Sequence, residues 1–377
     1  MLGLPVLTAP GGFYPTTLLF FLCWAFMVVT GLLLLEVNLW FSDDVSIVTM
    51  AGKTLGRWAG GLSWLLFAFL FYSLMIAYSS GSGQLFVDFL SLSTGIVLPL
   101  WAGSLFFCVT FGIFLYRGTG SVDQINRLLM IGPFAAYFVL IVMGSRHVHR
   151  EYLEHVNWPS AFWAIPAMIV SFGFHNLVPS LTTYLNRDGK KLRIAILVGS
   201  AIPLLIYLVW QWLILGMVPL AGEGGFLEAL EQGDMATRAL KHAVGSSWIV
   251  SFAEYFAFFA IVTSFLSVAL SFVDFLADGL QVKKDAKGKA FLCLLSLAPP
   301  FVFSTFYPHV FLSALSYAGG FGAVVLFGIF PALMVWVGRQ FPGRERFARF
   351  VPGGEIALMG VILFSCAVFI LELMHQV

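Results

Sequence analysis

The feature that most constrains this chain is a series of ten long apolar runs, each long enough to cross a membrane as a helix. A spanning helix needs ~20 mostly apolar residues to cross ~30 Å of hydrocarbon. In order, the runs lie at about 16–41, 60–88, 94–115, 125–144, 161–182, 192–217, 247–278, 289–306, 310–337 and 355–373. Because lipid offers no partner to an unpaired backbone group, each run is predicted to be helical. The sequence therefore predicts an all-α protein embedded in a lipid bilayer.

Composition excludes several other classes of protein. Of the 377 residues, 60% are hydrophobic and 10% are charged, whereas a soluble domain is roughly 25% charged. The net charge of +1 gives no reason to expect a nucleic-acid partner. No phosphate-binding loop, zinc-protease, hydrolase or paired-cysteine motif occurs, so neither an enzyme nor a bound cofactor is indicated. The three histidines of one loop lack the carboxylates or cysteines that would complete a metal site, so no metal is predicted; they are His147, His149 and His155.

The basic residues predict how the spans are oriented. Sixteen of the 20 Lys and Arg residues fall in alternate loops, and the other four fall in the opposite loops: Arg146, Arg150, Arg238 and Lys241. Cytoplasmic loops carry an excess of Lys and Arg. The richer set, which includes Arg344 and Arg346, is therefore predicted to be cytoplasmic, and the C-terminus to lie on the outer side.

Two prolines mark predicted helix breaks in corresponding parts of an internal repeat. Pro5 lies four residues after Met1, and Pro179 lies four residues after His175, at an offset of 174 residues (179 − 5). Proline has no N–H, so the carbonyls of Met1 and His175 are expected to lose their usual helical partner. Gly173 weakens the second helix further. Such breaks at matching positions point to the binding site of a transporter, although a packed kink would leave the same pattern.

The repeat gives one polytopic membrane domain, 1–377, with two inverted halves of five helices and an eleventh helix. Residues 1–9 would be the remnant of the first helix and 16–144 the rest of the first repeat. The second repeat would be 161–337, and the extra helix 355–373. Since Met1 would then lie near mid-membrane, the first helix is expected to be truncated, through a misplaced start or a shortened chain.

Polar residues inside apolar runs are the candidate site residues, because they are expensive in lipid. His175 and Asn176 would contact substrate in the broken segment, or pack against freed backbone. Phe172 and Phe174 flank Gly173 and suit either an aromatic box or ordinary core. His175 is also a candidate for proton coupling, since histidine titrates near neutrality.

Further candidates lie on other spans. Glu36 would act as a gate or proton carrier, would reach the membrane interface, or would pair with a basic loop residue. Thr263 begins a polar stripe with Ser267, Ser271 and Asp278 on one helix face, which is expected to face the bundle interior or a water path. On the span 60–88, the polar tips of Tyr78 and Ser79 would line the substrate site or bond between helices.

Longer stretches around these positions resemble the bacterial aromatic amino acid permeases, a family of tyrosine-specific and tryptophan-specific transporters. The closest match is Phe172–Ser180 (FGFHNLVPS) with Tyr184 and Lys190–Arg193; others are Leu32–Val37, Gly199–Pro203, Thr263–Asp278, Pro299–Tyr307 and Tyr317–Gly319. The resemblance implies the leucine-transporter fold, a bacterial inner-membrane location with the C-terminus in the periplasm, and proton-driven uptake. It also implies that Met1, Leu2 and Gly3 contact substrate, although the glycine-rich break that precedes this stretch in the family is absent here. In the wider fold, a pair like Thr263-Ser264 binds sodium.

The function predicted is therefore symport of tyrosine or tryptophan with protons into the cytoplasm, by alternating access. A sodium-coupled amino acid symporter of the same fold is the first alternative, and a channel is a remote one. A channel would need a continuous polar pore, whereas the chain offers two local breaks and one polar stripe. The choice among tyrosine, tryptophan and phenylalanine depends on few contacts, and the sequence leaves it open along with the oligomeric state.

Overall fold

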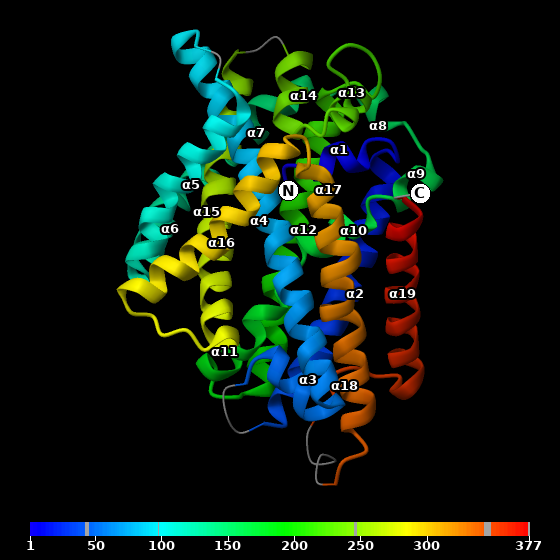
Figure 1. The fold of residues 1–377 in the computed structure, drawn as a ribbon. Coiled ribbons are helices and arrows are strands. Elements are labelled where there is room, and N and C mark those ends of the chain that lie inside the picture. The colour runs from blue at the N-terminus through cyan, green and yellow to red at the C-terminus, as the bar shows by residue number, and fades with distance from the viewer. Residues whose placement is uncertain (42–44, 97, 245–246, 343–347, 376–377) are drawn as a thin grey trace. The chain divides into compact units, whose positions relative to one another are not determined.

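Helices form the regular structure of the computed structural model, which describes residues 1–41, 45–96, 98–244, 247–342 and 348–375 (Figure 1). Ten helical stretches of the described chain are long and apolar enough to cross a membrane. They are Phe13–Leu39, Arg57–Asp88, Leu100–Arg117, Thr119–His147, Trp158–Tyr184, Gly189–Met217, Trp248–Leu280, Ala286–Phe306, Phe311–Gly338 and Gly354–His375. The ten predicted spans are thus confirmed, with ends that differ by up to about two turns.

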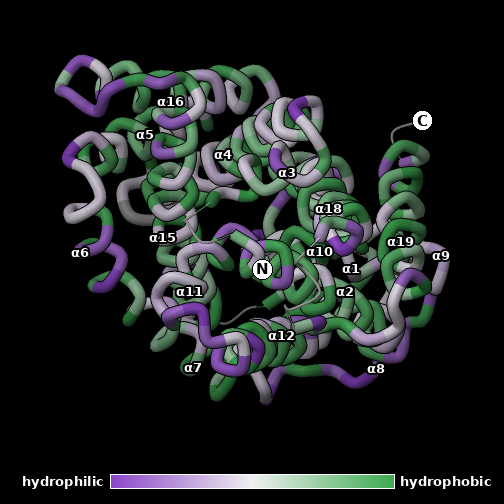
Figure 2. Tube along the Cα trace, turned by 90° about the horizontal axis from the view of Figure 1, so that it is seen from below, coloured by the Kyte–Doolittle hydropathy of each residue, from purple (hydrophilic) through white to green (hydrophobic). Residues whose placement is uncertain are grey.

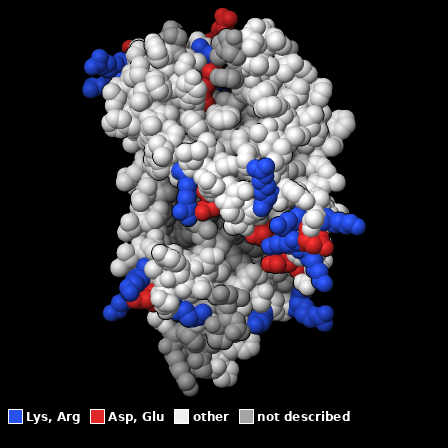
Figure 3. Space-filling view, turned by 90° about the vertical axis from the view of Figure 1, so that its left-hand side faces the viewer, with Lys and Arg blue, Asp and Glu red and all other residues white. Residues whose placement is uncertain are grey.

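Apolar and hydrophilic residues are distributed along the helices as expected for a chain embedded in lipid. Figure 2 shows apolar residues along most helices, with hydrophilic segments mainly at helix ends and connections. On the face drawn in Figure 3, the charged side chains gather in clusters, and wide areas carry none. Arg344 and Arg346, two of the residues used to predict orientation, lie outside the described residues.

The chain divides into two compact units, and the first comprises residues 1–13, 71–156 and 211–315. Helix α15 (Ser247–Leu280) is its centre and contacts α5 (Leu100–Arg117), α6 (Thr119–Leu129), α7 (Ile131–Gly144), α14 (Ala236–Ala243) and α16 (Ala286–Phe306). Aromatic pairs fill this core: the ring centroids of Phe107 and Phe265 lie 4.9 Å apart, and those of Phe71 and Phe272 lie 5.2 Å apart. The short helices of this unit are α1 (Leu4–Thr8), η1 (Ser145–His147), α8 (Arg150–Leu153) and α13 (Phe226–Glu231).

The second unit comprises residues 14–70, 157–210 and 316–377. It holds most of α2 (Phe13–Leu39), together with α3 (Ile47–Leu55), α9 (Trp158–Phe162), α10 (Ile165–Ser171), η2 (His175–Leu177), α11 (Val178–Tyr184), η3 (Ala318–Ile329), α18 (Phe330–Gly338) and α19 (Gly354–His375). The boundary between the units falls within four of the described helices: α2, α4 (Arg57–Thr94), α12 (Gly189–Met217) and α17 (Phe311–Tyr317).

The π-helix η3 is the centre of the second unit and contacts α10, α18 and α19. A π-helix is rare, and single turns of it often occur at functional sites. Glycines let neighbours approach it closely. A Cβ on Gly319 would overlap the backbone carbonyl oxygen of Pro166 in α10, and one on Gly320 would lie 2.6 Å from the Cβ of Glu372 in α19. The packing of this unit therefore depends on the absence of side chains along one helix.

Candidate functional site

The break predicted near Pro179 is present as a gap between two short helices. α10 ends at Ser171, a 3₁₀ turn covers His175–Leu177, and α11 begins at Val178 (Figure 1). Pro179 stands in the first turn of α11, where a missing N–H is tolerated. The His175 carbonyl, which cannot bond to Pro179, instead accepts the N–H of Val178. The prediction of a lost helical partner is thus correct, and a tighter 3₁₀ bond replaces that partner.

His175 is fully buried and is held on three sides. Its ring stacks on Phe327 of η3, with centroids 4.6 Å apart, and on Phe174, with centroids 4.9 Å apart. Its Nε2 lies 3.0 Å from the Thr30 hydroxyl on α2. The other ring nitrogen, Nδ1, is buried and has no hydrogen-bond partner among the described residues. A buried polar atom without a partner is uncommon in native proteins and calls for an explanation.

The other candidates of this segment divide between core and surface. Phe172 is 4% exposed and packs edge-on against Phe20 at 6.2 Å between centroids, beside Tyr207 at 5.3 Å, so it belongs to the core. Gly173 and Asn176 are exposed. Of the two phenylalanines, Phe174 contacts the His175 ring and Phe172 does not. The aromatic box that the sequence suggested from both phenylalanines is therefore not formed by this pair around the histidine.

The first break also contains bonded carbonyls. Met1 O accepts the N–H of Leu4 at 3.3 Å, and Leu2 O accepts the N–H of Ala236, the first residue of α14, at 3.1 Å. Pro5 stands in the first turn of α1. Gly3 is buried, and a Cβ there would lie 2.9 Å from the Leu312 side chain. The short N-terminal segment is therefore packed against the rest of the first unit.

The first unit also brings Tyr78 and Ser264 together, because their side chains are hydrogen-bonded. Ser79 is buried, and its Oγ lies 3.7 Å from the Cys108 sulfur. The Thr263 hydroxyl donates to the Phe259 carbonyl of its own helix at 2.8 Å. Tyr78 and Ser264 were expected from sequence to serve substrate and ion separately, whereas the structure joins them.

The polar stripe of α15 is largely at the surface. Ser267, Ser271 and Asp278 are exposed. Each serine hydroxyl donates to the carbonyl four residues earlier, Ser267 to Thr263 O at 2.8 Å and Ser271 to Ser267 O at 2.9 Å. Ser267 Oγ also accepts Asn126 Nδ2 of α6 at 2.9 Å. These residues therefore lie outside the packed interior, and a water path, the other alternative, stays a prediction.

Glu36 pairs with a basic residue, which is one of the three alternatives that the sequence left open. Arg339, directly after α18, donates from Nε to Glu36 Oε1 at 2.8 Å and from Nη2 to Oε2 at 2.9 Å. Only 3% of the Glu36 side chain and 15% of the Arg339 side chain are exposed. A bidentate arginine–carboxylate pair is both strong and geometrically specific. The pair fixes the end of α2 to the end of α18 within the second unit.

A cluster of charges surrounds α14 in the first unit. Arg238 of α14 bonds to Asp234 at 2.8 Å and approaches Asp88 of α4 at 3.7 Å. Lys241 of the same helix lies 3.8 Å from Glu254 of α15. Burial raises the pKa of Asp234 above its ordinary value, although the charge of Arg238 opposes this effect. These pairs join α14 to the spanning helices beside it.

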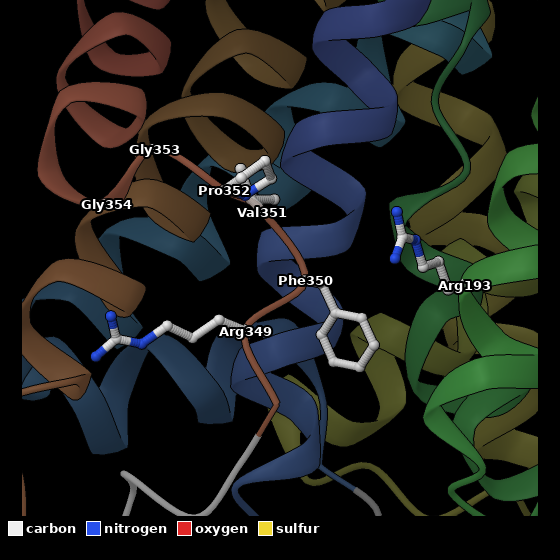
Figure 4. Close-up of a pocket in the computed structure, with 7 residues that line it drawn as sticks. All are labelled: Arg193, Arg349, Phe350, Val351, Pro352, Gly353 and Gly354. Carbon is white, nitrogen blue, oxygen red and sulfur yellow. The ribbon is translucent and has the colours of Figure 1, made fainter.

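A cavity of 430 Å³ lies in the second unit, between α12 and the segment that leads into α19 (Figure 4). Its lining consists of Arg193, Arg349, Phe350, Val351, Pro352, Gly353 and Gly354. Figure 4 shows that the Arg349 side chain extends away from Arg193. The two guanidinium groups therefore do not converge on one ligand position.

The loop histidines contact backbone carbonyls or a neighbouring ring. His147 Nδ1 lies 3.2 Å from Met143 O, and His155 Nε2 lies 2.9 Å from Pro10 O. The ring of His149 packs beside Tyr152. In the described part of the chain, no group of three or more His, Cys, Asp or Glu residues has a geometry that could hold a metal ion.

Sequence reasoning missed Thr30, Gly31 and Phe327, the residues that surround His175. A Cβ on Gly31 would lie 2.6 Å from the Phe174 ring, so the glycine makes room for that ring against α2. Threonine and phenylalanine are ordinary in spanning helices. The adjacent Thr30-Gly31 pair carries a weak signal of close helix packing, since small residues line helix interfaces in membranes.

A model of the tryptophan/tyrosine permease family matches residues 1–372 of this chain. The tyrosine-specific transport system 1 of Haemophilus influenzae is 34% identical over 375 residues, which cover 97% of this chain and 90% of that protein. The tryptophan-specific transport protein of the same organism is 30% identical over 380 residues, with coverage of 97% and 90%. The relatives are named as transport proteins, not enzymes.

Solved structures of transporters share the fold. MhsT in complex with L-phenylalanine gives a TM-score of 0.67 at 12% identity, over 98% of this chain and 93% of that one. A nucleobase-cation-symport-1 family transporter in a closed conformation, with bromovinylhydantoin bound, gives 0.59 at 14% identity, over 99% and 87%. The predicted leucine-transporter fold is thereby confirmed. Since its described residues form ten helices long and apolar enough to span, the chain is a multi-pass membrane protein.

Proposed function

We propose that this chain, which belongs to the tryptophan/tyrosine permease family, is a secondary active transporter that carries tyrosine or tryptophan across a membrane. The observation that carries the proposal is the match to the family over nearly the whole chain, together with relatives named for tyrosine and for tryptophan. A fold shared with transporters supports the same conclusion, since inverted-repeat transporters bind substrate where spanning helices are broken.

We place the substrate contact at His175 and the broken segment around it. The supporting observation is the unpartnered Nδ1 of His175, which is buried beside the ring of Phe174. A polar atom held among aromatic rings suits a ligand that has both a charged end and an aromatic end. Asn176 and Gly173 are exposed next to it and are available to the same ligand. For Met1, Leu2, Gly3, Tyr78 and Ser79, a role in substrate binding stays a prediction.

We further propose that transport is driven by protons and proceeds by alternating access in a bacterial inner membrane, with the C-terminus in the periplasm. Of the proton-coupling candidates, His175 is favoured over Glu36, because the Glu36 carboxylate is engaged by Arg339 through two hydrogen bonds. Sodium coupling through Thr263 and Ser264 is the alternative, although their hydroxyl groups already bond to Phe259 O and to Tyr78.

The test is uptake of labelled tyrosine, tryptophan and phenylalanine into proteoliposomes that contain the chain. We expect saturable uptake of tyrosine or tryptophan that depends on an imposed proton gradient and does not depend on sodium. Uptake that depends on sodium instead would show that sodium is the coupling ion. No uptake of any aromatic amino acid by folded protein would refute the proposal. His175→Gln is expected to reduce uptake, with His242→Gln on the exposed face of α14 as its matched control.

A further inference from the structure

The contact between Thr30 and His175 constrains which ring nitrogen carries the proton. The Thr30 Oγ1 atom lies 3.2 Å from the Met27 carbonyl oxygen and 3.0 Å from His175 Nε2. A hydroxyl has one hydrogen to donate and two lone pairs to accept with. The Met27 carbonyl can only accept. When the hydroxyl hydrogen points to Met27, the Thr30 oxygen is therefore free to accept an N–H from His175.

The opposite arrangement leaves a worse defect in the structure. If Thr30 donated to Nε2, a neutral ring would carry its hydrogen on Nδ1, which has no partner among the described residues. A buried N–H without an acceptor is rarer in proteins than an under-used acceptor. A doubly protonated ring would bury a charge with no carboxylate bonded to it among the described residues, which is costlier still. Both hydrogens, on Thr30 and on Nε2, are satisfied only in the first arrangement.

We propose that Thr30 is a positioning residue that holds His175 as the Nε2–H tautomer, so that the bare Nδ1 lone pair accepts a hydrogen bond from the ammonium group of an amino acid substrate. The ammonium part of this inference rests on the proposed function. A lone pair attracts an N–H donor and repels a carboxylate, so it distinguishes the two ends of a zwitterion. The tautomer therefore orients the substrate as well as binding it.

The rings beside His175 fix the direction of this lone pair. Phe327 lies nearly parallel to the imidazole, with an interplanar angle of 12°, and Phe174 lies at 24°. Gly31 leaves the space that Phe174 occupies, because a Cβ there would lie 2.6 Å from its ring. Stacking holds the plane of the imidazole, and the Thr30 bond holds its rotation within that plane. Together these contacts preorganise one acceptor, which reduces the ordering that binding must impose.

The experiment is ¹⁵N NMR of the full chain in lipid nanodiscs with labelled histidine. The signals of His175 are identified among the seven histidines by their loss in His175→Gln. Protonated and bare ring nitrogens differ strongly in ¹⁵N shift, so the spectrum gives the tautomer directly. We expect Nε2–H in the wild type, with the Nδ1 signal moving when tyrosine or tryptophan is added. We expect Thr30→Val to lose the single tautomer and Thr30→Ser to keep it.

Binding is measured on the same variants. Thr30→Val is expected to weaken amino acid binding about three- to tenfold, the effect of losing one hydrogen bond, and Thr30→Ser to restore it. Thr182→Val is the matched control, because Thr182 is also buried in this unit and its hydroxyl donates to Val178 O of its own helix. The control is expected to leave both the spectrum and the affinity unchanged.

The outcomes separate this inference from the proposed function. A wild-type spectrum with the hydrogen on Nδ1, or an unchanged tautomer in Thr30→Val, overturns the role of Thr30 whatever the transport result. Substrate that binds without moving the Nδ1 signal overturns the ammonium contact and leaves the transport proposal intact. If no aromatic amino acid binds or is transported, the proposed function fails, and the ammonium contact fails with it, while the spectrum still decides the tautomer.

Discussion

Replacing either partner of the Glu36–Arg339 pair should destabilise the second unit strongly and unequally. Removing one partner of a buried ion pair costs about 3–5 kcal/mol, because the other charge is left buried without compensation. Arg339→Met leaves a carboxylate that is 3% exposed, so we expect a loss near the upper end, about 5 kcal/mol. Glu36→Met leaves a guanidinium that is 15% exposed and can reach water more easily, so we expect about 3 kcal/mol.

The double variant Glu36→Met/Arg339→Met distinguishes a structural pair from a proton carrier. Replacing both members of a buried pair by apolar residues of similar size is often neutral, so its free energy of unfolding should return to within ~1 kcal/mol of the wild type. The assay is denaturant unfolding in mixed micelles, followed by gradient-driven uptake of tyrosine and tryptophan. If Glu36 serves structure alone, the double variant also recovers uptake.

An exposed ion pair in the same chain provides the matched control. Lys284 and Asp274 are 2.8 Å apart, and their side chains are 45% and 47% exposed. Surface pairs of this kind contribute about 0–1 kcal/mol, so Lys284→Met should change stability little. The reasoning would be refuted if the double variant lost as much free energy of unfolding as the two single variants together. A stable double variant without uptake would return Glu36 to a role in proton transfer.

Two further perturbations test the packing and the charge of the second unit. Gly319→Ala should lower the free energy of unfolding by about 1–3 kcal/mol, because its Cβ would overlap the Pro166 carbonyl oxygen. The control is Gly199→Ala in α12, where the Cβ meets open space and the change should be neutral or slightly stabilising. Equal effects of the two variants in unfolding titrations would contradict this. The backbone N–H of Lys191 is the largest cause that lowers the pKa of Asp188 below its ordinary 3.8. A lowered carboxyl pKa stabilises the fold above the unfolded pKa and loses that effect as pH falls. The stability advantage of the wild type over Asp188→Asn should therefore shrink below about pH 4, and a pH-independent difference would rule out this linkage.

The sequence by itself determined the membrane architecture of this protein and the place of one break. Ten runs of apolar residues can satisfy their backbones in lipid only as helices, so the spans followed from length and hydropathy. The break around His175 followed from Pro179 together with Gly173, because a proline offers no N–H to the carbonyl four residues earlier and a glycine weakens the helix before it. These are local properties of the chain, and no knowledge of its neighbours was needed to find them.

Only the tertiary structure decided what each polar residue contacts. Glu36 was open to three interpretations until Arg339, 303 residues away, was found beside it. His175 was a candidate from sequence, but the hydroxyl beside its Nε2 belongs to Thr30, 145 residues earlier, and the ring stacked on it belongs to Phe327. Phe172 and Phe174, equivalent in the sequence, separate into core and histidine neighbour because the turn after α10 sends them to different sides. Hydrogen bonds and ring stacking act over a few ångströms, and which groups come that close is set by how the helices pack.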